Sequence, residues 1–147
     1  MSAGQGCKFC GIASAASYAV FEDAISVAFL DHRPLFIGHT LLAPKDHIET
    51  LDDLPAALLA PFFANVQMLA RAVEQAMQAE GSFVAINNRV SQSVPHLHVH
   101  IVPRRKKDGL RGFFWPRQSH PDEGQMKQAQ AAIRKAIVYQ QNSRKEG

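Results

Sequence analysis

Three histidines alternate with apolar residues in a short segment between two prolines, His96-Leu-His98-Val-His100-Ile-Val-Pro103. Side chains on a β-strand alternate between its two faces, so we expect the three imidazoles on one face and the apolar residues on the other. The apolar residues can then pack on a helix while the imidazoles line a cleft. Because each buried ring nitrogen needs a hydrogen-bond partner, packing alone explains such a row poorly. The row could bind a metal, supply a nucleophile with an acid or base, or titrate as a pH sensor.

The segments around this row predict an α+β fold with a mostly antiparallel sheet of five strands. Residues 17–31 have the pattern of a β-hairpin, and residues 39–44, 82–88 and 97–102 each have the pattern of a single strand. Most connections between them are too short for a crossover helix, which favours antiparallel pairing. A sheet of this kind leaves an edge strand exposed, and pairing across a two-fold axis would cover it, so we expect a homodimer.

One long helix is predicted between the third and fourth strands. Asp52 or Asp53 could cap it, Pro55 would lie in its first turn and Gly81 would end it, while Pro61 predicts a kink or a later start. Its apolar face is expected to consist of Leu58, Phe62, Val66, Leu69, Val73 and Met77.

A second helix is predicted near the C-terminus. Ser119 and Asp122 have the spacing of a capping box, and Met126, Ala129, Ile133 and Ile137 would share one helical face.

The length and composition predict one ordinary globular domain. The chain has 147 residues, of which 46% are hydrophobic and 20% charged. We expect no membrane span, because no apolar run reaches about 18 residues. The N-terminus lacks the pattern of a secretory signal, so a cytoplasmic location is expected.

Basic residues are concentrated in one segment of a chain whose formal net charge is +3. Six of the 16 Lys and Arg residues lie between Arg104 and Arg117, with Asp108 the one acid among them. A phosphate-bearing partner would suit this segment, although charge alone favours a solvated loop. The two cysteines, Cys7 and Cys10, have C-x-x-C spacing, which fits a redox pair, half of a metal site or two idle thiols.

The histidine row resembles, without a gap, the His-x-His-x-His-x-x signature of the histidine-triad (HIT) family, in which each x is apolar. The resemblance covers about residues 7–105. It implies a HIT-like fold in which the five-stranded sheets of two subunits join, with residues 106–147 forming a basic loop and a C-terminal helix of one domain, 1–147. The other matching segments are Cys7-Lys-Phe-Cys10, Phe21-Glu-Asp, Ala28-Phe-Leu-Asp31, Gly38-His39-Thr-Leu, Pro44-Lys-Asp-His47-Ile, Asn87-Asn88 and Gln92-Ser93-Val94.

The resemblance implies hydrolysis or transfer at the α-phosphate of a nucleotide through a nucleotidyl-histidine intermediate. His98 would be the nucleophile, His100 would donate a hydrogen bond to the phosphate or bridging oxygen, and His96 would complete the triad. The remaining implied roles are phosphate binding by Asn88, Gln92 and Ser93, ribose binding by Asp31, flanking of the base by Phe29 and His32, and orientation of the triad by His39.

One loop departs from the family pattern. Family members often have a glycine-rich segment between the asparagine and the Gln-Ser pair, whereas this chain has Arg89-Val90-Ser91. Ser91 occupies a position where a glycine usually precedes the glutamine. The sequence therefore leaves open which backbone N–H groups of this loop could bind the phosphate. Arg89 could supply charge to the phosphate or could point to water.

The resemblance to some bacterial HIT proteins also implies a structural zinc. Cys7, Cys10, His47 and His96 form a set of two cysteines and two histidines, a common tetrahedral zinc composition. Residues two apart on a strand are separated by about 6.6 Å, so His96 can hold a metal while His98 stays available for the phosphate.

The leading expected activity is hydrolysis of a purine nucleoside phosphoramidate, as in the Hint-like branch. The alternative is a dinucleoside polyphosphate hydrolase of the Fhit-like branch, which Val102-Pro103-Arg104-Arg105 somewhat resembles. A non-catalytic nucleotide-binding protein would not need His98. A zinc finger that reads nucleic acid is disfavoured, because a finger has about a dozen residues between its ligand pairs and the gap from Cys10 to His47 is far longer.

Overall fold

The computed structural model describes residues 6–10, 18–110 and 122–146. The chain divides into two compact units, Met1–Asp108 and Gly109–Gly147. The first unit contains a sheet and a long helix, and the second contains the C-terminal helix. The expectation of one domain over the whole chain stays a prediction.

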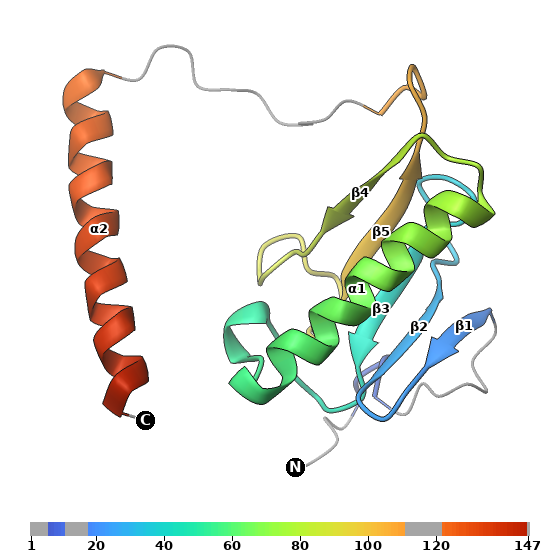
Figure 1. The fold of residues 1–147 in the computed structure, drawn as a ribbon, viewed down its shortest axis with the longest axis horizontal. Coiled ribbons are helices and arrows are strands. Elements are labelled where there is room, and N and C mark those ends of the chain that lie inside the picture. The colour runs from blue at the N-terminus through green and yellow to red at the C-terminus, as the bar shows by residue number, and fades with distance from the viewer. Residues whose placement is uncertain (1–5, 11–17, 111–121, 147) are drawn as a thin grey trace. The chain divides into compact units, whose positions relative to one another are not determined.

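The first unit contains a five-stranded sheet in the order β1-β2-β3-β5-β4, and every neighbouring pair is antiparallel (Figure 1). The predicted α+β class and the hairpin within 17–31 are confirmed. Two strands are shifted from their predicted positions. The strand predicted at 82–88 ends at Ala85, and the strand predicted at 97–102 begins only at Val99. The strands are β1 (Ala19–Glu22), β2 (Ser26–Leu30), β3 (Thr40–Pro44), β4 (Gly81–Ala85) and β5 (Val99–Arg104).

Helix α1 (Ala56–Ala76) crosses one face of this sheet (Figure 1). The predicted apolar face is confirmed, since Phe62, Val66, Leu69 and Val73 are buried in one core cluster and Leu58 and Met77 pack against it. Leu97, Val99 and Ile101 belong to the same cluster, which confirms that the apolar residues of the histidine row face the helix. The imidazoles are thereby directed away from α1.

The predicted start of α1 is wrong. Asp52 and Asp53 lie in a short 3-10 helix, η1 (Leu51–Asp53), and the Asp53 carboxylate accepts hydrogen bonds from the Thr50 amide and hydroxyl at 3.2 and 2.7 Å. The residue at the N-cap of α1 is Pro55, and the helix continues through Pro61 without starting there.

The predicted end of α1 is also wrong, because Gly81 begins β4. The helix ends at Ala76, and Gln78 takes the left-handed conformation with φ of 51°. The Gln78 amide then donates to the Gln75 carbonyl at 3.3 Å and the Ala79 amide to the Glu74 carbonyl at 2.9 Å. These two bonds form the hydrogen-bond pattern of a Schellman motif, with glutamine in place of glycine.

Helix α2 (Glu123–Glu146) forms the described part of the second unit. Its capping pair is Asp122 and Gln125: the Asp122 carboxylate accepts from the Gly124 amide at 2.8 Å, and Gln125 Oε1 accepts from the Asp122 amide at 3.3 Å. Ser119, expected to cap this helix, lies outside the described residues. The predicted apolar face of Met126, Ala129, Ile133 and Ile137 is present and exposed.

By length and apolar composition α1 could cross a membrane, and among the described helices no other could. A helix that packs on a sheet can have the same length and apolar composition, and the buried face described above gives α1 that role.

Candidate active site and metal centre

A cleft lies on the sheet face opposite α1. Val27, Phe29 and Leu41 form a second buried cluster there, with Phe9 packed against it. His100 is the direct partner of Leu41 in the β3–β5 register, so its side chain lies on this face. The cleft has a volume of about 560 Å³, within the range of small-molecule sites. Its lining consists of Lys8, Phe9, Tyr18, Phe29, Leu30, Asp31, His32, Arg33, Leu41, Ser93, Val94, His98 and His100.

The ring of His98 is held in one tautomer by the main chain. Its Nδ1 lies 2.7 Å from the His96 carbonyl oxygen, and since a carbonyl can only accept, Nδ1 is the donor. In the neutral ring Nε2 therefore keeps its lone pair. His98 is 5% exposed and lines the cleft, so this side chain has the form that a nucleophile requires.

His100 receives the opposite tautomer through His39. The Leu35 amide donates to His39 Nδ1 at 3.1 Å, so the proton of His39 is on Nε2, which donates to His100 Nδ1 at 3.0 Å. The remaining nitrogen of His100, Nε2, then carries a proton and is a hydrogen-bond donor. His39 thus contacts the triad through His100 without lining the cleft, and its orienting role stays a prediction.

Burial keeps these two rings neutral. It lowers the pKa of His39, against the opposing effect of the Asp31 carboxylate. Burial, together with the neighbouring His98 and His39, lowers the pKa of His100 to about 4, while Asp31 again opposes the shift. At neutral pH the donor next to His98, the candidate nucleophile, is therefore an uncharged imidazole.

The third histidine of the row faces the cysteines. His96 is fully buried, and its Nε2 donates to the Pro44 carbonyl at 2.8 Å, which leaves the lone pair on Nδ1. That nitrogen lies 3.4 Å from Cys7 Sγ and 3.6 Å from Cys10 Sγ, and His47 Nδ1 lies 3.2 Å from Cys10 Sγ. Burial lowers the pKa of His96 although the bond to Pro44 raises it, and His47 and His98 lower it further.

The four predicted ligands therefore come together, with their donor atoms all within 4.8 Å of one another. Two sulfurs and two imidazole nitrogens suit tetrahedral zinc. Metal-bound histidines usually donate their second N–H to a carbonyl or carboxylate, as His96 does to Pro44. The donor set fits zinc in both composition and hydrogen bonding.

A second cluster, Asp31, His39 and His100, is equally compact but does not fit a metal. The lone pair of His39 Nδ1 accepts the Leu35 N–H, so His39 Nε2 is protonated and has no lone pair for an ion. The 3.0 Å contact between His39 and His100 is a hydrogen bond in a relay.

Two of the predicted phosphate ligands brace a loop. Asn88 Oδ1 accepts from the Leu51 amide at 2.9 Å. Gln92 Oε1 accepts from the Arg89 amide at 2.8 Å, and Gln92 Nε2 donates to the Glu49 carbonyl at 2.6 Å. Neither residue is among those that line the cleft, whereas Ser93 is. Phosphate binding by Asn88 and Gln92 stays a prediction.

This loop has a glycine-type backbone without glycine. Arg89 and Ser91 have φ angles of 66° and 59°, in the left-handed region that costs an ordinary residue about 1 kcal/mol. The Gln92 bonds hold the loop in that shape. The guanidinium of Arg89 pairs with Asp52 at 3.2 Å, so its charge is directed to η1.

The predicted nucleoside contacts all lie in the cleft. Phe29 is a buried part of its wall, and His32 is exposed at its rim. Asp31 Oδ1 accepts from the Arg33 amide at 2.9 Å, and Oδ2 lies 3.8 Å from His39 Nε2. Their contacts with base and ribose stay predictions.

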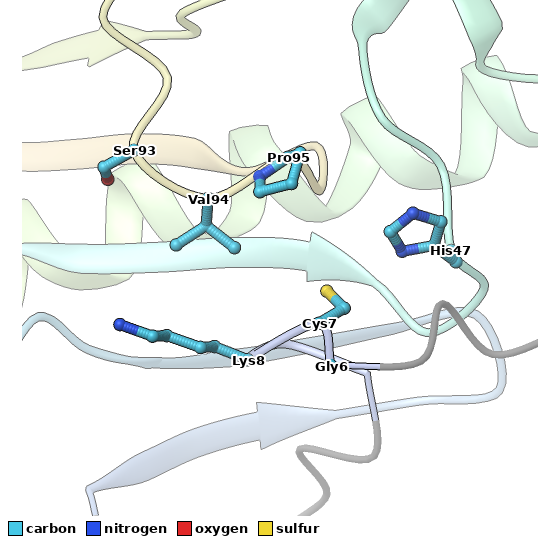
Figure 2. Close-up of a pocket in the computed structure, with 7 residues that line it drawn as sticks. All are labelled: Gly6, Cys7, Lys8, His47, Ser93, Val94 and Pro95. Atoms are coloured by element: carbon cyan, nitrogen blue, oxygen red, sulfur yellow. The ribbon is translucent and has the colours of Figure 1, made fainter.

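Several lining residues were not predicted from the sequence, above all Lys8 and Phe9. The one sequence feature that could have identified them is their position between the two cysteines. A smaller cavity of about 260 Å³ adjoins the candidate metal ligands, and Figure 2 shows Cys7 and His47 on one side of it and Lys8 and Ser93 on the other. Lys8, Ser93 and Val94 line both cavities.

Comparison with known proteins agrees with this geometry. A family model described as the HIT domain matches residues 13–107. An uncharacterised HIT-like protein of Mycobacterium tuberculosis is 39% identical over 108 residues, which cover 71% of this chain and 75% of that protein. An adenylylsulfatase of Arabidopsis thaliana is 32% identical over 108 residues (71% and 55%). An asymmetrical bis(5′-nucleosyl)-tetraphosphatase of Schizosaccharomyces pombe is 34% identical over 94 residues (63% and 52%), so the chain spans about half of these two enzymes.

Two solved structures share the fold. A HIT family protein from Bacillus subtilis has a TM-score of 0.77 at 32% identity, with 88% of this chain and 96% of that chain covered. A zinc-bound histidine triad family protein from Mycobacterium smegmatis has a TM-score of 0.66 at 35% identity, with 90% and 98% covered. The histidine row, the sheet that carries it and these matches lead to one conclusion: the chain belongs to the histidine-triad (HIT) family.

Proposed function

We propose that this protein hydrolyses nucleoside 5′-phosphate derivatives at the α-phosphate, with a purine nucleoside phosphoramidate as the leading substrate. The observation that carries the proposal is the bond from His98 Nδ1 to the His96 carbonyl, which leaves an unprotonated Nε2 on a ring that lines the cleft. Relatives named as an adenylylsulfatase and a bis(5′-nucleosyl)-tetraphosphatase support nucleotide hydrolysis.

The proposed reaction has two displacements. His98 Nε2 attacks the α-phosphorus, a P–N bond forms, and the leaving group departs with the electron pair of its bond to phosphorus and takes a proton from solvent. The ring is then a positively charged nucleotidyl-imidazolium, and its Nδ1–H remains bonded to the His96 carbonyl, which stabilises that charge. Water attacks the same phosphorus and loses a proton to solvent. The P–N bond to His98 breaks, its electron pair returns to Nε2, and neutral His98 and a nucleoside monophosphate are released. His100 Nε2–H donates to the phosphoryl or bridging atom in both steps.

The rest of the cleft would hold the nucleoside. Phe29, in a wall of apolar residues, offers a face to the base, and Asp31 keeps carboxylate lone pairs for ribose hydroxyls besides the one used by Arg33. Ser93 can donate its hydroxyl to a phosphate oxygen from the cleft lining.

Among the described basic residues after β5, the contacts of residues 104–106 favour a compact leaving group. Arg104 makes a two-bond contact with Asp108 at 2.6 and 3.0 Å, Arg105 donates to the Met77 carbonyl, and Lys106 Nζ lies 3.7 Å from Glu80. These side chains brace the turn after β5 and do not line the cleft. A dinucleoside polyphosphate remains the alternative substrate, since Lys8 and Arg33 do line it and the S. pombe relative acts on such a compound by name.

We expect His98→Ala to abolish hydrolysis and to leave folding and nucleotide binding largely intact, because only the nucleophilic nitrogen is removed. The measurement is turnover of adenosine and guanosine phosphoramidates and of dinucleoside polyphosphates, with mass spectrometry for a trapped nucleotidyl-protein. Lys106→Ala, in the turn after β5 and outside the cleft lining, is the control and should retain turnover within a few-fold. More than a few per cent of wild-type activity in His98→Ala would remove His98 as the nucleophile.

Zinc, when bound by Cys7, Cys10, His47 and His96, would supply a structural crosslink between the N-terminal loop and the segments that follow β3 and precede β5. Coordinating thiols must be reduced and deprotonated. A cytoplasmic location, which we propose for the protein, keeps them reduced.

We expect the purified protein to contain close to one zinc per chain by elemental analysis, with both thiols protected from alkylation until a chelator is added. Cys10→Ser should lose the metal and lower the melting temperature, but change kcat only modestly because His98 is not a ligand. His32→Ala should keep the metal. A zinc-free protein with reactive thiols would contradict the site, and a zinc-free variant that melts normally yet is inactive would place the metal in the chemistry.

The proposed oligomer is a homodimer joined through β4. This strand is an edge of the sheet, and Val84, which pairs with Ile101 on the α1 face, is 44% exposed. Pairing with β4 of a second copy would satisfy the open edge and cover Val84.

We therefore expect wild type to sediment as a dimer at micromolar concentration and Val84→Asp to sediment as a monomer. Val20→Asp tests the other edge strand, β1, at a valine that is 52% exposed, and should remain dimeric. A monomeric wild type, or dissociation by Val20→Asp alone, would contradict the proposed interface.

The lowered pKa of His100 predicts a pH dependence of stability. Its pKa falls from 6.5 to about 4 in the fold, so between these values the unfolded chain binds more protons than the native one. The free energy of unfolding should therefore decrease as pH falls through this window, and His100→Gln should lose less stability than wild type. Urea unfolding across the window measures this, with His32→Gln as the exposed control. Parallel curves for wild type and His100→Gln would refute it.

A further inference from the structure

We propose that the loop between the two cysteines is part of the nucleotide pocket, and that zinc binding raises nucleotide affinity by fixing Phe9 and Lys8 there. The inference rests on the proposed function, because it assumes that the cleft binds a nucleotide. It adds a second role for the metal centre: the same ion that crosslinks the loop would prepare the binding wall.

Phe9 lies between the nucleophile and the wall assigned to the base. Its ring centroid is 5.1 Å from that of His98 with an interplanar angle of 90°, and 5.3 Å from that of Phe29 with an angle of 69°. Both contacts are edge-to-face, a favourable arrangement for aromatic rings. Phe9 also packs against the buried cluster that includes Leu41. Displacement of Phe9 would therefore open the wall next to His98.

Lys8 directs a positive charge to the same cleft. In Figure 2 the sulfur of Cys7 lies on the side of His47, while the side chain of Lys8 extends the other way, past Val94 and toward Ser93. Lys8 lines both cavities, so it lies on the boundary between the metal centre and the cleft. An anionic phosphate at His98 would be attracted by this ammonium group.

The position of this loop depends on the cysteine contacts. Residues 6–10 belong to no helix or strand, and the two sulfurs join them to His47, which follows β3, and to His96, which precedes β5. A metal replaces these weak sulfur–nitrogen contacts with four coordinate bonds and removes much of the freedom of the two residues between the cysteines. Nucleotide binding to the loaded protein then costs less conformational entropy.

Coupling of this kind is reciprocal, so the nucleotide must raise zinc affinity by the same factor as zinc raises nucleotide affinity. The probes are Zn²⁺, AMP and GMP. Calorimetry gives the nucleotide Kd of zinc-loaded and zinc-stripped protein, and competition with a chromogenic chelator gives zinc affinity with and without saturating nucleotide. We expect about a tenfold effect in both directions for wild type.

Phe9→Ala identifies the route of the coupling. This variant should still bind zinc, should bind nucleotide about tenfold more weakly when loaded, and should show a coupling factor near one. Phe63→Ala, which truncates a phenylalanine 37% exposed on α1, is the matched control and should retain the wild-type factor. Lys8→Ala should weaken binding of the monophosphates, while Lys106→Ala, far more exposed and paired with Glu80, should not.

Two results would overturn the inference. One is equal nucleotide affinity of loaded and stripped wild type. The other is a wild-type coupling factor in Phe9→Ala, which would mean that the metal acts through overall folding. Unfolding of the stripped chain would lead to the same conclusion. Failure of loaded wild type to bind AMP or GMP would instead refute the proposed function. If the protein hydrolyses its substrate but zinc and nucleotide do not affect each other's affinity, the proposed function stands and only the proposed role of the loop between the cysteines is refuted.

Discussion

Hydrogen bonds between histidine rings and the main chain determine what each ring of the row can do. A carbonyl oxygen forces the nitrogen it contacts to be a donor, so the other nitrogen keeps its lone pair. His98 bonds to the His96 carbonyl and His96 to the Pro44 carbonyl, which gives a candidate nucleophile and a candidate metal ligand. The Leu35 amide imposes the opposite tautomer on His39, and His100 thereby becomes a donor. One repeated residue type thus supplies three different chemical groups.

Hydrogen bonds fix these tautomers, and burial influences the charge of the rings. Burial lowers the pKa values of His39, His96 and His100, and of these three rings His100 lines the cleft, where it presents an uncharged donor to an anionic phosphate. Neutral rings suit both proposed roles, because a nucleophile and a metal ligand each need a lone pair. Positive charge among the cleft residues comes from Lys8 and Arg33. The phosphate would therefore be attracted by peripheral cations and oriented by uncharged donors.

Patterns with a fixed period could be read from the sequence, and features that depend on distant partners could not. The alternation through Leu97, Val99 and Ile101 and the helical repeat through Phe62 report directly which face is buried. The turn at Gln78 and the left-handed Arg89 could not be read in this way. The turn at Gln78 closes with the two local bonds of a Schellman motif, without the glycine that usually marks one. Arg89 is held by Gln92, which also donates to the Glu49 carbonyl 43 residues away, and these bonds outweigh a local preference for glycine. For the same reason Lys8 and Phe9 carried no signal beyond the cysteines that flank them.

The two-residue spacing of the row explains how a metal and a nucleophile can share one segment without competing. If zinc took a lone pair from His98, no attacking nitrogen would remain. The segment before β5 instead brings His96 to the cysteines, and the main-chain carbonyl of that residue holds His98. A displacement of His96 would therefore move the acceptor that fixes the tautomer of His98. The proposed influence of the metal on the cleft passes through one aromatic ring, Phe9, and does not require the ion to touch the substrate.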